Sequence, residues 1–195
     1  MTAPYITFEG IEGTGKSTMA ARLAAHLEAG GIDVLFVREP GGTATGELIR
    51  EVLLDPGGSV APWTEALLFA AARAQLANEI VGPALRRGCW VVSDRSVYSS
   101  LAYQGGGRGL GVAVVRAINA PGLGDVWPDL VVLLDLDAAT GLARQLDPDR
   151  IGAEDASFQA TVARTFTALA VAEPDRFVAV DASGDTESVW HRVLE

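Results

Sequence analysis

Lysine is nearly absent from this chain: of the 15 basic side chains among its 195 residues, Lys16 is the only lysine and the rest are arginine. Cysteine is equally scarce, because Cys89 stands alone and leaves no internal disulfide to form. The longest apolar run, residues 66–72, has about seven residues, where about 20 are needed to span a bilayer. Residues 1–9 also lack the basic start and apolar stretch of a signal peptide. The sequence therefore predicts a reducing, cytoplasmic location and no membrane-spanning helix.

Basic charge is in deficit as well. The 15 lysines and arginines face 25 aspartates and glutamates, which gives a net charge of −10. A general nucleic-acid binder or a binder of anionic membranes needs a broad basic face, so neither partner is expected. The net negative charge does not exclude a phosphate-bearing small molecule, because a few focused cations and backbone N–H groups can bind it inside an acidic protein.

Residues typical of transition-metal sites and thiol chemistry are too few to form one. His26 and His191 lie far apart in the chain, and a single cysteine completes neither a zinc site nor a Cys–His nucleophile pair. The apolar fraction of 49% and the charged fraction of 21% are close to the globular average. The length suits one domain with a substantial core, so we expect a single domain over residues 1–195.

The order of apolar patterns predicts an α/β fold. Short β-rich runs alternate with stretches whose apolar residues recur at helical spacing. Strands are expected at residues 5–9, 34–37, 90–93, 130–134 and 177–180. Helices are expected at residues 16–29, 46–54, 62–78 (or, with a break near Pro83, 62–87), 110–120, 136–146, 158–172 and 186–194. The remaining loops of interest are 40–45, 55–61, 104–109 and 147–157. Strands joined through helices favour a five-stranded parallel sheet with helices on both faces.

A phosphate-binding loop follows the first predicted strand. It matches the pattern G-x-x-x-x-G-K-[ST] between a strand and a helix, and it consists of Gly10, Ile11, Glu12, Gly13, Thr14, Gly15, Lys16, Ser17 and Thr18. Glycines let successive backbone N–H groups point at a phosphate, and the following helix adds the positive end of its dipole. Lys16 supplies a compact charge to the β- and γ-phosphates, and the Ser17 hydroxyl is placed to ligate Mg²⁺.

Charged residues follow two other predicted strands, at the sheet edge where ligands of such folds bind. Arg38 ends the second strand, and Asp94 and Arg95 end the third. Asp94 is placed to hold Mg²⁺ directly or through water, while two arginines suit a second, phosphate-bearing substrate because guanidinium binds phosphate bidentately. A small GTPase is excluded, since its Asn-Lys-x-Asp motif needs a second lysine.

These segments resemble the thymidylate kinases. The resemblance extends from about Tyr5 to Asp181 and is carried by segments 8–18, 38–42 (Arg-Glu-Pro-Gly-Gly), 67–75, 94–96 (Asp-Arg-Ser) and 102–106 (Ala-Tyr-Gln-Gly-Gly). It implies a P-loop kinase fold with a short lid. It also implies a homodimeric enzyme that uses ATP and Mg²⁺ to convert dTMP to dTDP for dTTP biosynthesis.

The resemblance also implies roles for individual residues. Lys16, Arg95 and Arg150 would be catalytic, and the substrate-binding residues would be Glu12, Arg38, Phe69, Arg73, Arg95, Ser99, Ser100, Tyr103 and Gln104. Arg38 and Arg95 would hold the dTMP phosphate, and Glu12 would lie near the acceptor sugar. Phe69 would stack on thymine with Arg73 at the base edge, as their i, i+4 spacing on one helix face allows. Ser99 and Ser100 would reach the base or phosphate region, and Tyr103 would exclude a ribose 2′-OH.

A lid is expected at about residues 144–157. Members of the family carry a catalytic arginine either in the P-loop or in the lid, and here Gly13 and Thr14 follow Glu12, which assigns it to the lid. The segment holds only Arg144 and Arg150; the latter lies in an Asp-Arg-Ile match to the family's lid and is the expected arginine. Arg144 is the alternative.

Three functional alternatives follow from the residues themselves. A kinase acting on dUMP or another monophosphate keeps the same motifs. A deoxynucleoside kinase needs a carboxylate base at the 5′-OH, whereas two arginines favour a monophosphate, whose oxygen is already anionic. We therefore expect no obligatory proton acceptor. A nucleotide-binding protein without catalysis would explain the sparse lid.

Overall fold

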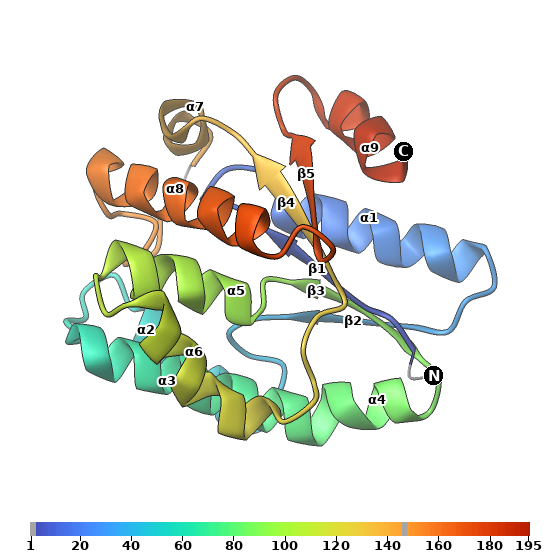
Figure 1. Cartoon of the computed structure of the whole chain (residues 1–195), viewed down its shortest axis with the longest axis horizontal. Helices are drawn as coiled ribbons and strands as arrows, with labels where there is room; N and C mark the ends of the chain where they lie inside the picture. Colours follow the sequence, from blue (N-terminus) through green and yellow to red (C-terminus); the bar gives the residue numbers. More distant parts are fainter. Residues whose placement is uncertain (1–2, 146–147) are drawn as a thin grey trace.

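The computed structural model describes residues 3–145 and 148–195 and has a five-stranded parallel sheet at its centre (Figure 1). The strands are β1 (Tyr5–Glu9), β2 (Val34–Arg38), β3 (Trp90–Asp94), β4 (Leu130–Asp135) and β5 (Phe177–Asp181). Their order across the sheet is β2-β3-β1-β4-β5. Phe8 of β1 pairs with Asp94 of β3 and with Val132 of β4, so the carboxyl ends of the three central strands lie at one edge. The α/β class with five parallel strands is confirmed.

Helices cover both faces of the sheet, as predicted. They are α1 (Lys16–Ala29), α2 (Ala44–Leu54), α3 (Pro62–Leu76), α4 (Gly82–Arg86), α5 (Val97–Ser100), α6 (Val112–Leu123), α7 (Ala138–Ala143), α8 (Ala156–Ala172) and α9 (Thr186–Leu194). Two π-helical segments, η1 (Ala77–Val81) and η2 (Leu101–Gly107), continue α3 and α5. Helices α1 and α9 lie on one face and α3 to α6 and α8 on the other (Figure 1).

Alternation along the strands explains this three-layer arrangement. Phe8 of β1 points into a cluster with Met19 of α1 and Trp190 of α9. Tyr5, three residues earlier in the same strand, points to the opposite cluster with Leu76 of α3. Because successive side chains of a strand point to opposite faces, an apolar strand buried on both faces needs a helical layer on each.

The predicted loop at 104–109 is wrong for residues 104–107, because these residues are helical in η2. The three glycines that look like a loop are in fact points of close packing. A Cβ at Gly106 would lie 2.1 Å from Thr165 Oγ1, and one at Gly107 would lie 2.6 Å from the ring of Phe158. Glycine is required here so that η2 can approach α8.

Helix boundaries differ from the expected ones by a few residues. Helix α2 begins at Ala44 because the Thr43 side chain accepts a 2.9 Å hydrogen bond from Gly46 N. Near Pro83 the helix is not broken outright but is interrupted by the π-helical segment η1, so that Pro83 lies in the first turn of α4, where its missing N–H is tolerated. Helix 110–120 is displaced to Val112–Leu123, and helix 136–146 shortens to Ala138–Ala143; its expected end, residue 146, lies outside the described residues. Within the described part of the chain, no helix is long and apolar enough to cross a membrane.

Candidate active site

A cavity of about 350 Å³ opens at the carboxyl ends of β1, β2 and β3. Most of the residues that the sequence assigned to the site line it: Glu12, Gly13, Gly15, Lys16, Ser17, Thr18, Arg38, Phe69, Asp94, Arg95, Ser99, Ser100, Tyr103 and Gln104. Arg73 and Arg150 do not line it, nor do Gly10, Ile11 and Thr14 at the base of the P-loop. The parallel sheet thus brings together residues from segments far apart in the sequence.

The P-loop has the backbone geometry of an anion cradle. Gly10, Gly13 and Gly15 all have positive φ, at 141°, 76° and 89°. A Cβ at Gly13 would lie 2.0 Å from the carbonyl oxygen of Gly141, so only glycine fits there. No side chain caps the start of α1 at Gly15, which leaves its N-terminal N–H groups available to a phosphate.

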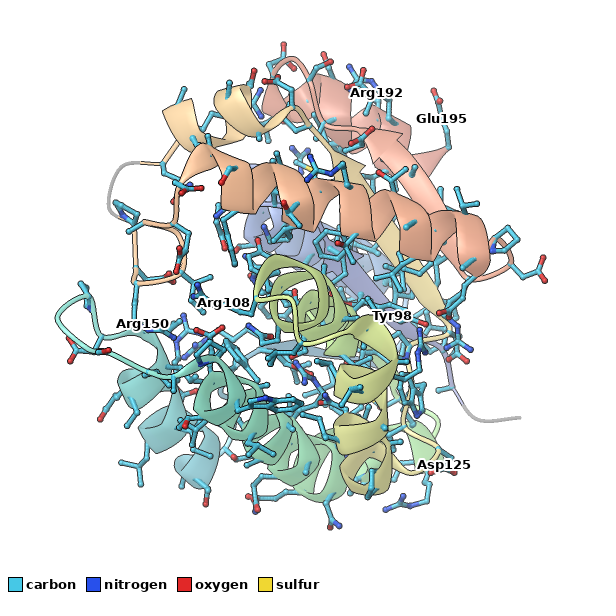
Figure 2. All side chains as sticks on the ribbon, turned by 60° about the vertical axis from the view of Figure 1, so that its left-hand side comes forward. Tyr98, Arg108, Asp125, Arg150, Arg192 and Glu195 are labelled. Carbon is cyan, nitrogen blue, oxygen red and sulfur yellow. The ribbon has the colours of Figure 1, made fainter. Side chains whose placement is uncertain are left out.

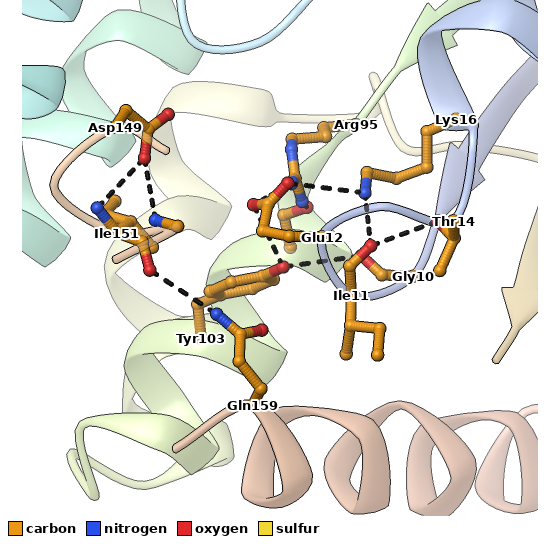
Figure 3. Close-up of polar contacts among 12 residues, drawn as sticks. Gly10, Ile11, Glu12, Thr14, Lys16, Arg95, Tyr103, Asp149, Ile151 and Gln159 are labelled. Atoms are coloured by element: carbon orange, nitrogen blue, oxygen red, sulfur yellow. Dashed lines mark hydrogen bonds and ion pairs between the residues drawn. The ribbon is translucent and has the colours of Figure 1, made fainter. Parts of the chain in front are cut away.

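An alternating charge cluster lies beside this loop (Figure 3). Glu12 accepts a short hydrogen bond from Arg95 Nη2, and its Oε2 lies 3.8 Å from Lys16 Nζ, which itself donates to Ile11 O at 2.6 Å. Burial raises the pKa of Glu12, but the charges of Arg95 and Lys16 outweigh it and lower that pKa to about 2. Burial and the charge of Arg95 lower the pKa of Lys16 to about 8. Glu12 therefore separates two cations that are both aimed at the cavity.

Ser17 and Asp94 meet across the P-loop, as predicted for a Mg²⁺ site. Ser17 Oγ donates to Asp94 Oδ2 at 2.5 Å, and Asp94 Oδ1 is buried with no hydrogen-bond partner among the described residues. A buried carboxylate oxygen without a partner is costly unless a cation or water completes it. No cluster of three acidic, histidine or cysteine residues is present in the described part of the chain. One carboxylate and one hydroxyl fit Mg²⁺, which takes its other ligands from phosphates and water.

Two arginines line the end of the cavity formed by β2 and α2. Arg38 is about half exposed, and its Nη2 donates to both carboxylate oxygens of Glu47, at 3.0 and 3.1 Å. Arg50 donates from Nη1 to Pro40 O at 2.8 Å. Burial and the nearby charge of Arg38 lower the pKa of Arg50. These two guanidinium groups make this end of the cavity a second anion site.

Aromatic and hydroxyl groups line the remaining wall. Phe69 from α3 contributes its ring, and the buried Ser100 Oγ has no hydrogen-bond partner among the described residues. The buried Tyr103 packs under Arg95, whose guanidinium carbon lies 5.2 Å from the ring centre. Ser99 is held by Glu9, because its Oγ donates to Glu9 Oε2 at 2.6 Å. An unpartnered hydroxyl and an aromatic ring in the same cavity suit a flat, polar-edged base.

Arg73 occupies a different position from the expected one at the cavity. It is buried and donates to Glu39 Oε2 at 2.7 Å, to Asn119 Oδ1 at 2.6 Å and to Ser96 O at 3.1 Å. Burial, opposed by the charge of Arg73, raises the pKa of Glu39 to about 7. In this structure Arg73 joins α3 to β2, α5 and α6 behind the cavity wall, and its contact with a base stays a prediction.

The two lid arginines contact different parts of the molecule. Arg150 binds Glu65 Oε2 at 2.8 Å and donates to Leu53 O at 2.9 Å, beside Arg108 (Figure 2). Its neighbours Asp149 and Ile151 do line the cavity. Arg144 instead donates to Ala182 O at 3.2 Å and Gly184 O at 3.3 Å. It lines a second cavity of about 320 Å³ with Gly13, Thr18 and Thr186.

Three functional positions were missed by sequence reasoning. Glu9 is fully buried and accepts from Ser96 N and Ser96 Oγ, both at 2.7 Å, so it orients the start of α5. The sequence feature that could have identified Glu9 is an acidic residue at the end of an apolar strand. Arg50 and Glu65 belong to helices and match no local motif; only the fold carries them to the site.

These features are those of a P-loop phosphotransferase: an anion cradle, a hydroxyl and a carboxylate that fit Mg²⁺, and further arginines in the same cavity. Similarity to known proteins identifies its family. The thymidylate kinase family model matches residues 8–193. A thymidylate kinase from Deinococcus radiodurans is 48% identical, over 98% of this chain and 96% of that protein. One from Bifidobacterium longum is 46% identical, over 97% and 95%. The crystal structure of thymidylate kinase from Ehrlichia chaffeensis superposes with a TM-score of 0.81 at 29% identity, covering 100% of this chain and 98% of that one. The chain belongs to the thymidylate kinase family.

Proposed function

We propose that the cavity transfers the γ-phosphoryl group of ATP to dTMP, the reaction of the family to which this chain belongs. The observation that carries the proposal is that one cavity of about 350 Å³ is lined both by the P-loop with Lys16 and by Arg38, Arg50 and Arg95. The P-loop with Lys16 would form the donor side, and Arg38 and Arg95, with Arg50 nearby, would form the acceptor side. Phosphoryl transfer depends on such positioning and on charge stabilisation, since it needs little covalent chemistry from the protein.

On the donor side, Lys16 and the N–H groups of the P-loop would bind the phosphates of ATP. Ser17 and Asp94 would hold Mg²⁺, and the unpartnered Asp94 Oδ1 supports this assignment. Bound there, Mg²⁺ would neutralise the negative charge that develops on the phosphates during transfer. The second cavity begins at Gly13 and Thr18 on the other side of the P-loop, where Arg144 would contact the nucleoside part of ATP.

On the acceptor side, Arg38 and Arg95 would hold the dTMP phosphate, while Phe69, Ser100 and Gln104 would contact the base. The attacking oxygen is a phosphate oxygen that is already anionic at neutral pH, so no carboxylate has to remove a proton. Glu12 supports this reasoning, because its pKa of about 2 makes it a poor base and leaves it as a fixed negative charge between Arg95 and Lys16.

We assign the lid arginine to Arg150, at the wall of the same cavity. In the structure its side chain turns away to Glu65, while Asp149 and Ile151 on either side face the cavity. To reach the transferred group, the guanidinium would have to leave Glu65 and turn into the cavity. The lid, residues 144–157, would act within a single kinase domain over residues 1–195.

Assembly and location complete the proposal. We expect a homodimer, because α3 and α6 expose the apolar side chains Trp63, Leu67 and Val114, which are 46%, 55% and 47% exposed. Sedimentation of the purified chain measures this directly. A reducing, cytoplasmic location is proposed from the single cysteine.

ADP release tests the activity. ATP and Mg²⁺ are supplied with dTMP, dUMP, UMP, dCMP, AMP or no acceptor, and dTMP is expected to give the highest kcat/KM. Arg150→Ala should lower kcat by a factor of about 10³–10⁵, whereas Arg144→Ala should mainly raise the KM for ATP. Tight ATP binding without turnover of any acceptor would contradict the proposal and indicate a binding protein instead.

A further inference from the structure

Glu65, in the first turn of α3, is a fully buried carboxylate with an unusual number of donors. Arg108 donates to its Oε1 and Oε2, each at 3.1 Å, and Arg150 binds its Oε2 at 2.8 Å. The fourth donor is Gln104 Nε2, at 2.8 Å from Oε1. Burial raises the pKa of Glu65, but these hydrogen bonds outweigh burial and lower it, so the group stays ionised.

An ionised carboxylate accepts hydrogen bonds and donates none, which determines how Gln104 is oriented. The Gln104 amide has to turn its NH₂ group toward Glu65, and its carbonyl oxygen therefore points the other way. Gln104 lines the cavity, and its Oε1 accepts no hydrogen bond from any described residue and is not among the buried atoms left unpartnered. The cavity consequently contains a fixed hydrogen-bond acceptor.

A fixed acceptor distinguishes pyrimidine bases by the protonation of ring atom N3. Thymine and uracil carry an N3–H donor between two carbonyl groups, whereas N3 of cytosine is an acceptor beside an amino group. An acceptor that meets N3 of cytosine would leave two lone pairs opposed and a buried polar group unpaired, which is strongly unfavourable. A rotated amide would pair with cytosine instead.

We propose that Glu65 is a positioning residue for base selection: it holds the Gln104 amide in the orientation that accepts from an N3–H and so rejects cytidine nucleotides. This inference rests on the proposed function, because it takes the cavity as the site of the acceptor base. Glu65 itself does not contact the substrate. Glu65 acts through Gln104, and it does so because its charge forbids the alternative orientation.

The variant that tests this is Glu65→Gln, which keeps the size of the side chain and adds a donor. Gln at position 65 can donate to Gln104 Oε1, so both amide orientations become accessible. The kcat/KM ratio of dTMP to dCMP is expected to fall at least about tenfold, the size of a lost hydrogen-bond discrimination. The ratio of dTMP to dUMP should stay unchanged, because those bases share N3–H and differ by a methyl group.

The control is Glu154→Gln. Glu154 accepts from Arg108 Nη1, so the variant disturbs the same arginine without touching Gln104. It should leave both ratios unchanged. Any release of Arg150 in Glu65→Gln would alter kcat for every acceptor alike and would cancel in the ratios.

Each failure has a separate signature. If wild-type protein does not turn over dTMP, the proposed function fails. If wild type prefers dTMP and Glu65→Gln lowers turnover of all three nucleotides equally, Glu65 is only structural and this inference is overturned. Should Glu65→Gln not fold, Gln104→Leu decides: an unchanged dTMP-to-dCMP ratio overturns the inference, and a lowered one with an intact dTMP-to-dUMP ratio supports it.

Discussion

Glu12 is expected to stabilise the folded protein and, at the same time, to oppose nucleotide binding. Its carboxylate stands between Arg95 and Lys16, and these two charges hold its pKa at about 2. Replacing it by Gln keeps the shape and leaves the two cations facing each other. A phosphate that enters the cavity would supply the missing negative charge.

The magnitude follows from the pKa. The shift from 4.5 to about 2 corresponds to about 3 kcal/mol of stability at neutral pH. Because the folded pKa is depressed, this contribution is complete above about pH 4.5 and is lost as the pH falls toward 2. Glu12→Gln should therefore lower the free energy of unfolding by about 3 kcal/mol at pH 7 and by about 1 kcal/mol at pH 3.

Urea unfolding at both pH values measures the difference, and thermal unfolding with and without ADP measures the linkage. ADP should raise the melting temperature of Glu12→Gln more than that of wild type. The matched control is Glu187→Gln, which removes an exposed carboxylate paired with Arg22 and should matter far less. An equal loss of stability at pH 7 and pH 3, or an equal effect of ADP on both proteins, would refute the reasoning.

Two further predictions concern the metal position and the sugar pocket. Asp94→Asn should raise the Mg²⁺ concentration needed for half-maximal turnover, because a neutral amide is a weaker ligand, and activity should recover as Mg²⁺ is titrated in; turnover that stays lost at unchanged Mg²⁺ affinity would instead make Asp94 a base. Tyr103→Phe should keep the preference for dUMP over UMP, since the hydroxyl makes only hydrogen bonds of 3.3 and 3.5 Å. Tyr103→Leu should lower that preference about tenfold or more by opening space for a 2′-OH, and an equal loss in Tyr103→Phe would show that the hydroxyl, not the ring, selects the sugar.

Local patterns determined the strands, the helical layers and the nucleotide loop of this protein. The P-loop could be located because its glycines, Lys16 and Ser17 form one continuous segment whose backbone conformation is set by the residues themselves. Arg38, Asp94 and Arg95 could be placed beside it, because parallel strands end at a common edge. The π-helical structure of residues 101–107 could not be predicted, because a run of glycines predicts a loop unless α8 is known to pack against it.

Only the tertiary structure decided which charges are available and which are already paired. Arg73 and Arg150 are both arginines at family positions, yet one is buried among Glu39, Asn119 and Ser96 and the other is bound to Glu65. The sequence alone determined that these arginines are present and predicted them at the cavity. Their direction depends on partners 23 to 97 residues away in the chain, whose distance in space no local pattern encodes.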